Sequence, residues 1–183
     1  MLTEEILKRL YPRMAANPKT CAAIFPHLAS ALAEAQVNTK LRLAAFMAQV
    51  GHESGEFKYM EEIWGPTPAQ LRYEPPTTLA ARLGNTQKGD GFRYKGRGPI
   101  QLTGRANYRA CGTALGLPLE DHPEEGATLE VAFRIAGWFW TSHRLNVLAD
   151  AGDFDGITKA INGGTNGKED RDRRYQEALA ILT

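Results

Sequence analysis

Two glutamates, Glu53 and Glu62, are the residues of this chain best suited to do chemistry together. Two carboxyl groups that flank a glycosidic bond can hydrolyse it, one as acid and the other as base or nucleophile. On one continuous helix, a separation of nine residues would make the two side chains face opposite ways. We therefore expect a helix to end between them, near Gly55. The alternative is that both are solvated residues at a helix end, as surface glutamates commonly are.

The stretch Tyr94–Gly104, YKGRGPIQLTG, is the second candidate for chemistry. Its glycines allow the backbone to pass close to a ligand. Gln101 and Thr103 alternate with apolar residues, so in an extended segment both polar side chains would face one way. An amide and a hydroxyl on one face suit sugar recognition or the holding of a water. The structural alternative is a glycine-rich hairpin with a polar outer face, and the phosphate-binding pattern G-x-x-x-x-G-K-[ST] is absent.

His52 stands directly before Glu53, as in zinc proteases, but the rest of that motif is missing. It requires a second histidine four residues after the first, and position 56 is a glutamate. A metal held by His52 and Glu56 on one helix face is the less favoured alternative. We expect His52 to pack or hydrogen-bond beside Glu53, and we predict no metal site. No Gly-x-Ser-x-Gly nucleophile elbow is present either.

Aromatic residues and late polar residues each have two interpretations. The WFW segment at 138–140 could offer a platform for a sugar, but at helical spacing in the most apolar segment such residues are more often core. Trp64, in a loop beside the acidic cluster, is the better candidate for stacking on a sugar ring. Asn162 ends a predicted helix and Arg171 follows it. The pattern alone favours a helix end and a surface arginine over a groove amide and a guanidinium that fixes a carboxylate.

Composition limits the class of protein. The 183 residues, 43% hydrophobic and 23% charged, suit one compact domain with its own core. The formal net charge of +1 gives no indication of nucleic-acid or membrane binding, and no run approaches the ~18 apolar residues of a membrane span. The first residues do not form a signal peptide, so we expect synthesis in a cytoplasm. Cys21 and Cys111 are expected to be free thiols, with a disulfide as the alternative.

Periodic apolar residues predict a mainly helical chain. Helices are expected over residues 3–13, 20–36, 39–54, 104–115, 129–143, 153–161 and 168–182, with Thr103 and Thr128 as caps of the fourth and fifth. Thr67-Pro68-Ala69-Gln70 predicts the start of a short helix, and another is expected over 77–83. Asn85–Gln101 is predicted to be loop with a small β element. Residues 56–91 are expected to form a smaller lobe within a single domain, 1–183.

Four stretches of the chain resemble glycoside hydrolase family 19. They are AQVGHESG (48–55), YKGRGPIQLTGRANY (94–108), WFWTSHRLNVLADAGDFD (138–155) and INGGTNGKEDRDRRY (161–175). The stretches follow in the family's order, and the second is a long and specific signature. Within the family, the chain is similar to the plant-type chitinases and more closely to the phage and prophage endolysins.

The resemblance implies a lysozyme-like, mainly α fold with two lobes, a small β-hairpin and a cleft between the lobes. It also implies hydrolysis of β-1,4 bonds in N-acetylglucosamine-containing chains, with inversion and no cofactor. Inverting enzymes hold their carboxyl groups about 6.5–9.5 Å apart. Glu53 corresponds to the general acid and Glu62, assisted by Thr103, to the base. The expected substrate-binding or acid-orienting residues are His52, Trp64, Tyr94, Gln101, Asn107, Tyr108, Asn162 and Arg171.

The chain departs from the chitinases at the base. They carry it further from the acid, on a loop that this sequence does not reproduce, so Glu74 and Glu61 are rivals of Glu62. Several chitinase cysteines and loops are also absent, which favours the shorter endolysin branch and peptidoglycan as the substrate. A chitinase and a non-catalytic cell-wall binding module are the alternatives.

An endolysin implies a cellular setting as well. Its substrate would be the glycan strands of peptidoglycan, and its effect would be lysis of the host cell. Because we expect no signal peptide, a holin-type membrane permeabiliser is implied as a partner. We expect a monomer in the host bacterial cytoplasm until release to the periplasm and cell wall. We expect no separate wall-binding domain, no nucleic-acid partner and no stable membrane association.

Overall fold

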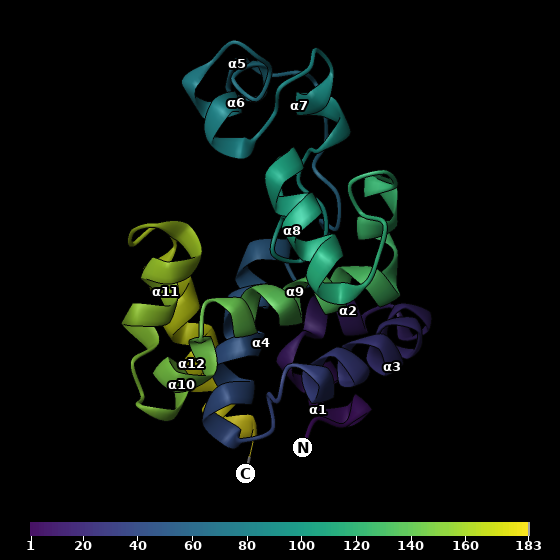
Figure 1. Ribbon diagram of the computed structural model, residues 1–183. Coiled ribbons are helices and arrows are strands. Elements are labelled where there is room, and N and C mark those ends of the chain that lie inside the picture. The colour runs from purple at the N-terminus through teal and green to yellow at the C-terminus, as the bar shows by residue number, and fades with distance from the viewer. Residues whose placement is uncertain (183) are drawn as a thin grey trace. The chain divides into compact units, whose positions relative to one another are not determined.

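The computed structural model describes residues 1–182 and is mainly helical (Figure 1), as predicted. Its helices are α1 (Glu4–Leu10), α2 (Pro12–Ala15), α3 (Pro18–Glu34), α4 (Lys40–Ser54), α5 (Pro68–Leu71), α6 (Thr78–Leu83), α7 (Asp90–Arg93), α8 (Arg105–Leu115), the 3₁₀ helix η1 (Pro123–Ala127), α9 (Leu129–Ser142), α10 (Leu145–Asp150), α11 (Phe154–Asn162) and α12 (Lys168–Ile181). Unit 1 comprises Met1–Lys58 and the chain from Phe139 onward, and unit 2 is Tyr59–Trp138. Within residues 1–182, every helix is too short or too polar to span a bilayer.

Helix α4 is the central element of unit 1. It begins where the Thr39 hydroxyl accepts a hydrogen bond from the Arg42 amide at 3.3 Å, and it ends at Gly55, whose φ of 59° is left-handed. The end predicted near Gly55 is therefore confirmed. All residues from Leu43 to Gly51 are buried, because α10, α11 and α12 pack against this helix. A helix buried on every side holds its last turn in a fixed place, and that turn carries Glu53.

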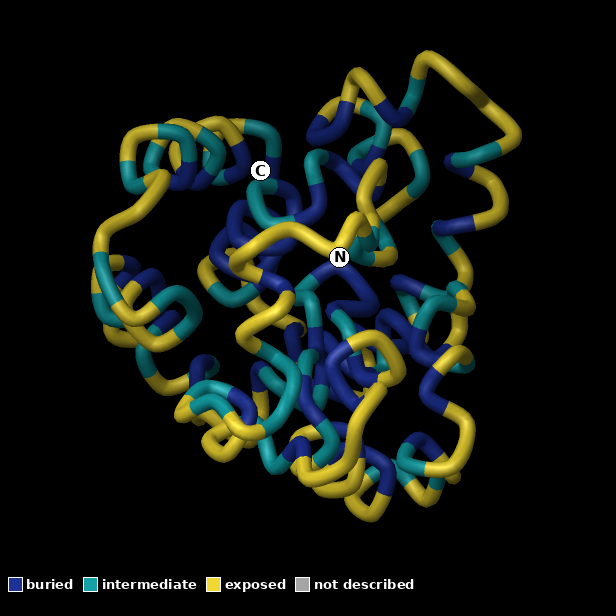
Figure 2. The backbone as a smooth tube through the Cα atoms, turned by 90° about the horizontal axis from the view of Figure 1, so that it is seen from above, coloured by how far each residue is buried: buried dark blue, intermediate teal, exposed yellow. Residues whose placement is uncertain are grey.

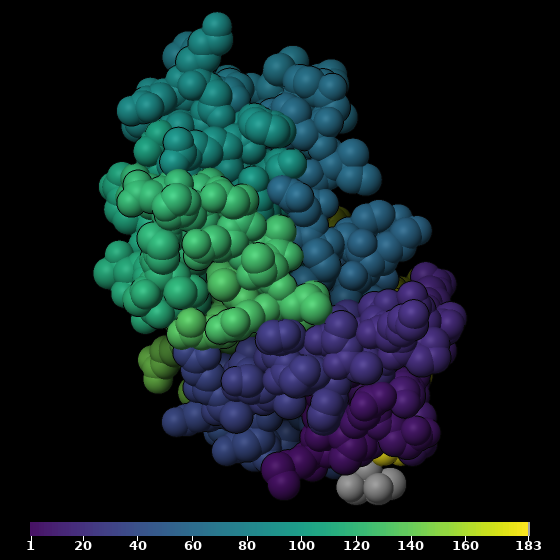
Figure 3. Space-filling view, turned by 90° about the vertical axis from the view of Figure 1, so that its right-hand side faces the viewer, coloured from purple at the N-terminus to yellow at the C-terminus, as the bar shows by residue number. Residues whose placement is uncertain are grey.

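The first helices of unit 1 cover another part of this core. The Tyr11 hydroxyl, at the junction of α1 and α2, donates a hydrogen bond to the carbonyl of Met47 in α4 at 2.5 Å. A Cβ at Gly51 would lie 2.7 Å from the Tyr11 ring, so glycine is needed for this approach. Figure 3 shows the outer surface of α1 to α3 in purple. Along the whole backbone, the exposed residues lie mostly on loops and on one side of helices (Figure 2).

Unit 2 is built from short helices and tight turns. The predicted β element consists of two isolated antiparallel bridges, Arg97 to Leu102 and Glu61 to Arg97, rather than a hairpin with regular strands. Its core holds buried residues from the glycine-rich stretch, α8, the connection that follows α8, and α9: Tyr94, Leu102, Tyr108, Cys111, Leu119, Val131 and Ile135. Cys111, and Cys21 in unit 1, are free and buried, so the predicted free thiols are confirmed.

The element predictions differ from the structure in a few places. The capping box at Thr67 is present, and the side chain of Asp153 caps α11, which was expected to begin at that residue. Thr103 does not cap α8: the N-cap is Gly104, and the Thr103 hydroxyl donates to the carbonyl of Gln101 at 2.9 Å. Helices α7 and α10 were not predicted, because each is only one or two turns long. The smaller lobe was expected over 56–91, whereas the second compact unit runs from Tyr59 to Trp138.

The buried carboxylate of Asp90 should contribute strongly to the stability of unit 2. It accepts hydrogen bonds from the amides of Thr86 (2.8 Å) and Gln87 (3.0 Å) and from Arg105 Nε (3.0 Å) and Nη2 (2.6 Å). Burial alone would raise the pKa of Asp90, but the bonds from Arg105 and the two amides outweigh it and lower the pKa. Because the folded-state pKa lies below the unfolded one, this contribution is present above pH ~4 and is lost as the pH falls through the folded value.

We therefore expect Asp90→Asn to lower the free energy of unfolding by about 3 kcal/mol at pH 7, since it breaks a buried ion pair. The difference from the parent chain should shrink below pH 4. Urea unfolding of both proteins at pH 7 and pH 3 checks this. An equal difference at both pH values would contradict it, and the exposed Asp121→Asn serves as the control.

Candidate functional site

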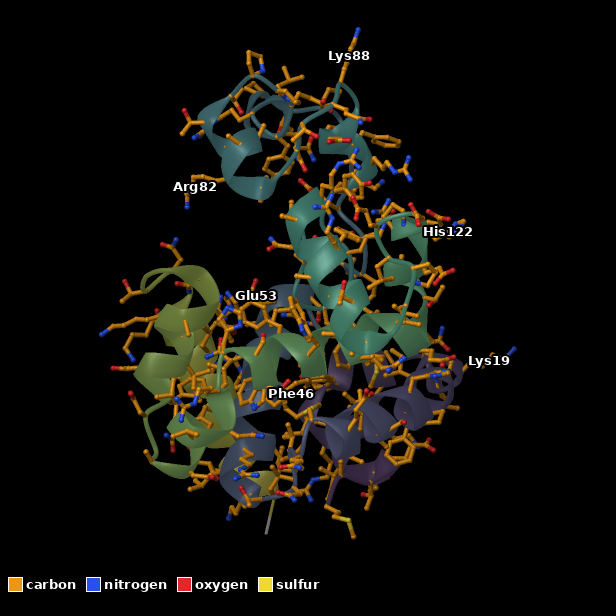
Figure 4. The ribbon with its side chains drawn as sticks, viewed as in Figure 1. Lys19, Phe46, Glu53, Arg82, Lys88 and His122 are labelled. Atoms are coloured by element: carbon orange, nitrogen blue, oxygen red, sulfur yellow. The ribbon has the colours of Figure 1, made fainter. Side chains whose placement is uncertain are left out.

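Glu53 lies in the last turn of α4, where Figure 4 labels it. Its side chain is 23% exposed, and its Oε1 accepts a hydrogen bond from Nη2 of Arg171 on α12. Arg171 itself is only 2% exposed. The surface arginine favoured by pattern alone is thus wrong, and the guanidinium that fixes a carboxylate is what the structure contains. Glu53 Oε2 forms no hydrogen bond with the residues described here, so it is the oxygen that a substrate could use.

His52 has a different partner from the one expected. Its Nδ1 lies 2.7 Å from Oδ2 of Asp170 on α12, and the ring fills the space beside Gly167. A Cβ at Gly167 would lie 2.3 Å from His52 Nε2, and the φ of 69° there also favours glycine. Burial opposes the charge of Asp170, but bonds from His52, Arg174 and Arg173 lower its pKa well below the usual range. His52 is therefore tied to α12 rather than to Glu53.

Glu62 is held by two uncharged donors in unit 2. Its Oε1 accepts from Nε2 of Gln70, and its Oε2 accepts from the amide of Gly96, both at 2.9 Å. The Glu62 amide in turn donates to the Gly96 carbonyl at 2.8 Å. Gln70 is buried, and its Oε1 accepts from the amides of Gly65 and Thr67. The carboxylate is thus fixed in place, and among residues 1–182 no cation forms an ion pair with it.

Glu61 and Glu74, the two rivals of Glu62 as the base, have different hydrogen-bond and ion-pair partners from Glu62. Glu61 pairs with Arg97 Nε at 3.0 Å and with Lys95 Nζ at 3.3 Å. Glu74 accepts from the amides of Gly89 (2.8 Å) and Phe92 (3.3 Å), and so holds the turn around α7. Glu61 therefore has its charge balanced by two cations, and Glu74 organises the backbone. Of the three carboxylates, Glu62 has the surroundings that best suit a base.

Gln101 and Thr103 lie against Gly96, next to Glu62. A Cβ at Gly96 would lie 2.6 Å from Gln101 Oε1 and 3.3 Å from Thr103 Oγ1. The two side chains share one side, as expected, but not through a regular extended segment, because Gln101 has a left-handed φ of 54°. The Gln101 amide also donates to the Gly98 carbonyl at 2.9 Å. Together, a carboxylate, an amide and a hydroxyl gather around one glycine, and such a set can hold and polarise a water.

Trp64 belongs to an aromatic cluster beside Glu62. Its ring centroid lies 6.2 Å from that of Tyr73 and 5.7 Å from that of Phe92, which is 53% exposed. Burial, and then the nearby charge of Glu62, raise the pKa of Tyr73. The cluster therefore offers partly exposed rings close to the candidate base, as a sugar platform requires.

Two further predicted site residues, Tyr94 and Tyr108, lie in the core of unit 2. Tyr94 and Tyr108 are fully buried, and their hydroxyls donate to the carbonyls of Glu120 (2.9 Å) and Lys95 (2.8 Å). Burial raises the pKa of Tyr108 to about 12. Both tyrosines thus anchor the glycine-rich stretch and α8 to the core of unit 2, and a role of either one at a substrate stays a prediction.

The two predicted asparagines lie on different elements. Asn107 is exposed on α8 and donates to the Thr103 carbonyl at 2.7 Å, so its carbonyl oxygen is open to solvent. Asn162 accepts from the Gly164 amide at 2.7 Å and donates to the Asn166 carbonyl at 2.9 Å, and so shapes the loop after α11. No group of three or more potential metal ligands exists among residues 1–182.

A family model described as chitinase class I matches residues 15–151. The chain belongs to glycoside hydrolase family 19. It is accordingly a glycosidase, an enzyme that hydrolyses glycosidic bonds. Among the curated proteins, it is 29% identical to a glycosyl hydrolase family 19 domain-containing protein of Haemophilus influenzae, over 98% of this chain and 96% of that one. It is 43% identical to the endochitinase At2g43610 of Arabidopsis thaliana, over 68% of this chain but only 40% of the plant protein.

Solved structures of the family share the fold. Chitinase C from Streptomyces griseus matches with a TM-score of 0.76 and 27% identity, over 98% of this chain and 76% of that chain. A class IV chitinase from Zea mays matches with a TM-score of 0.63 and 28% identity, over 87% and 80% of the two chains. The predicted lysozyme-like helical fold is therefore confirmed.

Proposed function

We propose that this family 19 enzyme is an endolysin that cleaves β-1,4 bonds of bacterial peptidoglycan by an inverting mechanism. The observation that carries the mechanism is the environment of Glu62, a fixed carboxylate beside Gln101 and Thr103 that has no ion pair within the described residues 1–182. Such a group can take a proton from a water. The resemblance of its four sequence stretches to the phage and prophage endolysins supports that branch and thus peptidoglycan.

In the proposed reaction, Glu53 gives its proton to the glycosidic oxygen as the bond to C1 breaks. Glu62 takes a proton from a water whose oxygen forms the new bond to C1 from the opposite face, which inverts the configuration there. Arg171 holds the Glu53 carboxyl through one oxygen and leaves the other free. Gln101 and Thr103 orient the water, and Trp64 and Asn107 contact the sugars.

The cellular part of the proposal follows from the endolysin assignment. The enzyme would act as a monomer on glycan strands and cause cytolysis, which would make it antimicrobial. A holin-type partner would release it from the host cytoplasm to the periplasm and cell wall.

A chitinase is the second candidate, because the Arabidopsis relatives and the Streptomyces and Zea mays structures all bear that name. A non-catalytic wall-binding module is the third, and the presence of both carboxylates argues against it. Release of soluble products from purified peptidoglycan and from chitin, compared at equal enzyme concentration, separates the first two.

Mass spectrometry of borohydride-reduced products from Gram-negative peptidoglycan tests the proposal directly. Reduced N-acetylmuramic acid at the new ends would support a muramidase. Reduced N-acetylglucosamine ends would indicate a glucosaminidase-type cut, and products from chitin alone would indicate a chitinase. Folded protein that binds both polymers and releases nothing would contradict every catalytic candidate and support the binding module.

A further inference from the structure

The guanidinium of Arg171 is held from three directions inside unit 1. Its Nη2 donates to Glu53, its Nη1 to Oε1 of Gln49, and its Nε to the carbonyl of Asn166 at 3.2 Å. Gln49 and Glu53 lie one turn apart on α4, so their side chains share one face. The place of the Glu53 carboxylate therefore depends on how Gln49 holds Arg171.

Gln49 is itself fixed by a second buried contact. Its side chain is fully buried, and its Nε2 donates to Oγ1 of Thr158 on α11 at 2.8 Å. Thr158 is only 1% exposed. A rotated amide would turn its donor toward the guanidinium and its acceptor toward the hydroxyl. Since unpaired buried polar groups are costly, this orientation is enforced.

The absence of charge on Gln49 also matters. A glutamate at this position would have nearly the same shape but would compete with Glu53 for the same guanidinium. With glutamine there, Glu53 is the one carboxylate paired with Arg171 among residues 1–182. We infer that Gln49, held by Thr158, is a positioning residue for the acid: it orients Arg171 toward Glu53 and leaves the arginine's charge to that carboxylate. This inference rests on the proposed role of Glu53.

Several other ionic groups on α4 and on the helices packed around it are already paired. They are His52, Arg173 and Arg174 with Asp170, Arg174 also with Glu56, Lys168 with Asp155 and Asp172, and Arg42 with Asp150. A change at Gln49 should therefore act mainly through Arg171 and Glu53.

The test compares Gln49→Glu, Thr158→Val and Thr158→Ser, with kcat and KM measured across pH on the substrate that the product analysis identifies. Gln49→Glu should move the pH dependence of kcat upward, because a second carboxylate near Glu53 favours the protonated form of the acid. Thr158→Val should lower kcat on the order of 10-fold with little change in KM, since a misplaced acid slows the chemical step. Thr158→Ser keeps the hydroxyl and should restore most of kcat.

A folded Gln49→Glu variant with the parent pH profile would overturn the inference. If that variant does not fold, the comparison of Thr158→Val with Thr158→Ser decides. Equal kcat in Thr158→Val and the parent chain would overturn the inference. A lower kcat in Thr158→Val, with kcat largely restored in Thr158→Ser, would support it. Glu53→Gln is assayed alongside. A fully active Glu53→Gln would refute the role of Glu53 itself, whereas an inactive one beside an unaltered Gln49→Glu would refute only the positioning role of Gln49.

Discussion

Glu53→Gln should reduce kcat/KM at least about 10³-fold while the protein stays folded. Glutamine keeps the shape of the side chain and can still accept the hydrogen bond from Arg171, but it has no proton to give to the leaving oxygen. Because the binding surface is unchanged, affinity for the polymer should remain close to that of the parent chain. Turnover is measured by release of reducing ends, and affinity by pull-down with insoluble substrate.

Two controls separate loss of the acid from loss of structure. The variant leaves Arg171 without its anion, so we expect a modest cost of about 1–2 kcal/mol in the free energy of unfolding, smaller than for a fully broken buried pair. Glu169→Gln, at an exposed position in the first turn of α12, should leave both turnover and stability unchanged. A folded Glu53→Gln variant with substantial activity would refute the assignment.

Glu62→Gln should reduce kcat by about 10²–10⁴-fold, whereas the same change at its two rivals should not. Glutamine at 62 can keep the bonds to Gln70 or Gly96 in part, but it cannot remove a proton from water. Glu61→Gln weakens ion pairs with Lys95 and Arg97 on a largely exposed side chain and should cost less than 1 kcal/mol. Glu74→Gln should loosen the turn at α7, so we expect a lower melting temperature and little change in kcat.

A small anion can distinguish the base from other causes of inactivity. Azide needs no deprotonation, so in Glu62→Ala it can replace the activated water. It would then attack C1 from the face that the water uses, opposite the leaving oxygen. The expected product is a glycosyl azide of inverted configuration, which NMR identifies. If azide rescues Glu74→Ala or Glu61→Ala and leaves Glu62→Ala inactive, Glu62 is not the base.

The helical part of the fold was predictable because its signals are local. The apolar period of α4, its threonine cap and the glycine at its end all lie within one short segment, and the structure has each of them. The order of elements in unit 2 was harder to predict from the sequence. Helix α7 is one turn long and begins after a glycine with positive φ. Neither apolar periodicity nor a capping side chain therefore predicts it from the sequence.

The supports of the site could not be predicted for a different reason. Gln70 is part of a recognisable capping box, yet its bond to Glu62 joins a helix start to a loop residue that no local pattern connects. Gln49 looks like one more position in a buried helix, and its partners lie more than one hundred residues later in the chain. The full burial of Tyr94 and Tyr108 was not predicted either, because residue type alone does not distinguish an aromatic anchor from an aromatic contact.

The two free thiols have a practical consequence for labelling. Cys21 and Cys111 are fully buried, and burial raises the pKa of the Cys111 thiol to about 12, so at neutral pH neither offers a reactive thiolate at the surface. A single cysteine introduced at the exposed Lys88 could therefore be coupled to a maleimide dye without first removing the native pair. The sequence thus already provides a background for fluorescence imaging of the enzyme on an insoluble polysaccharide substrate.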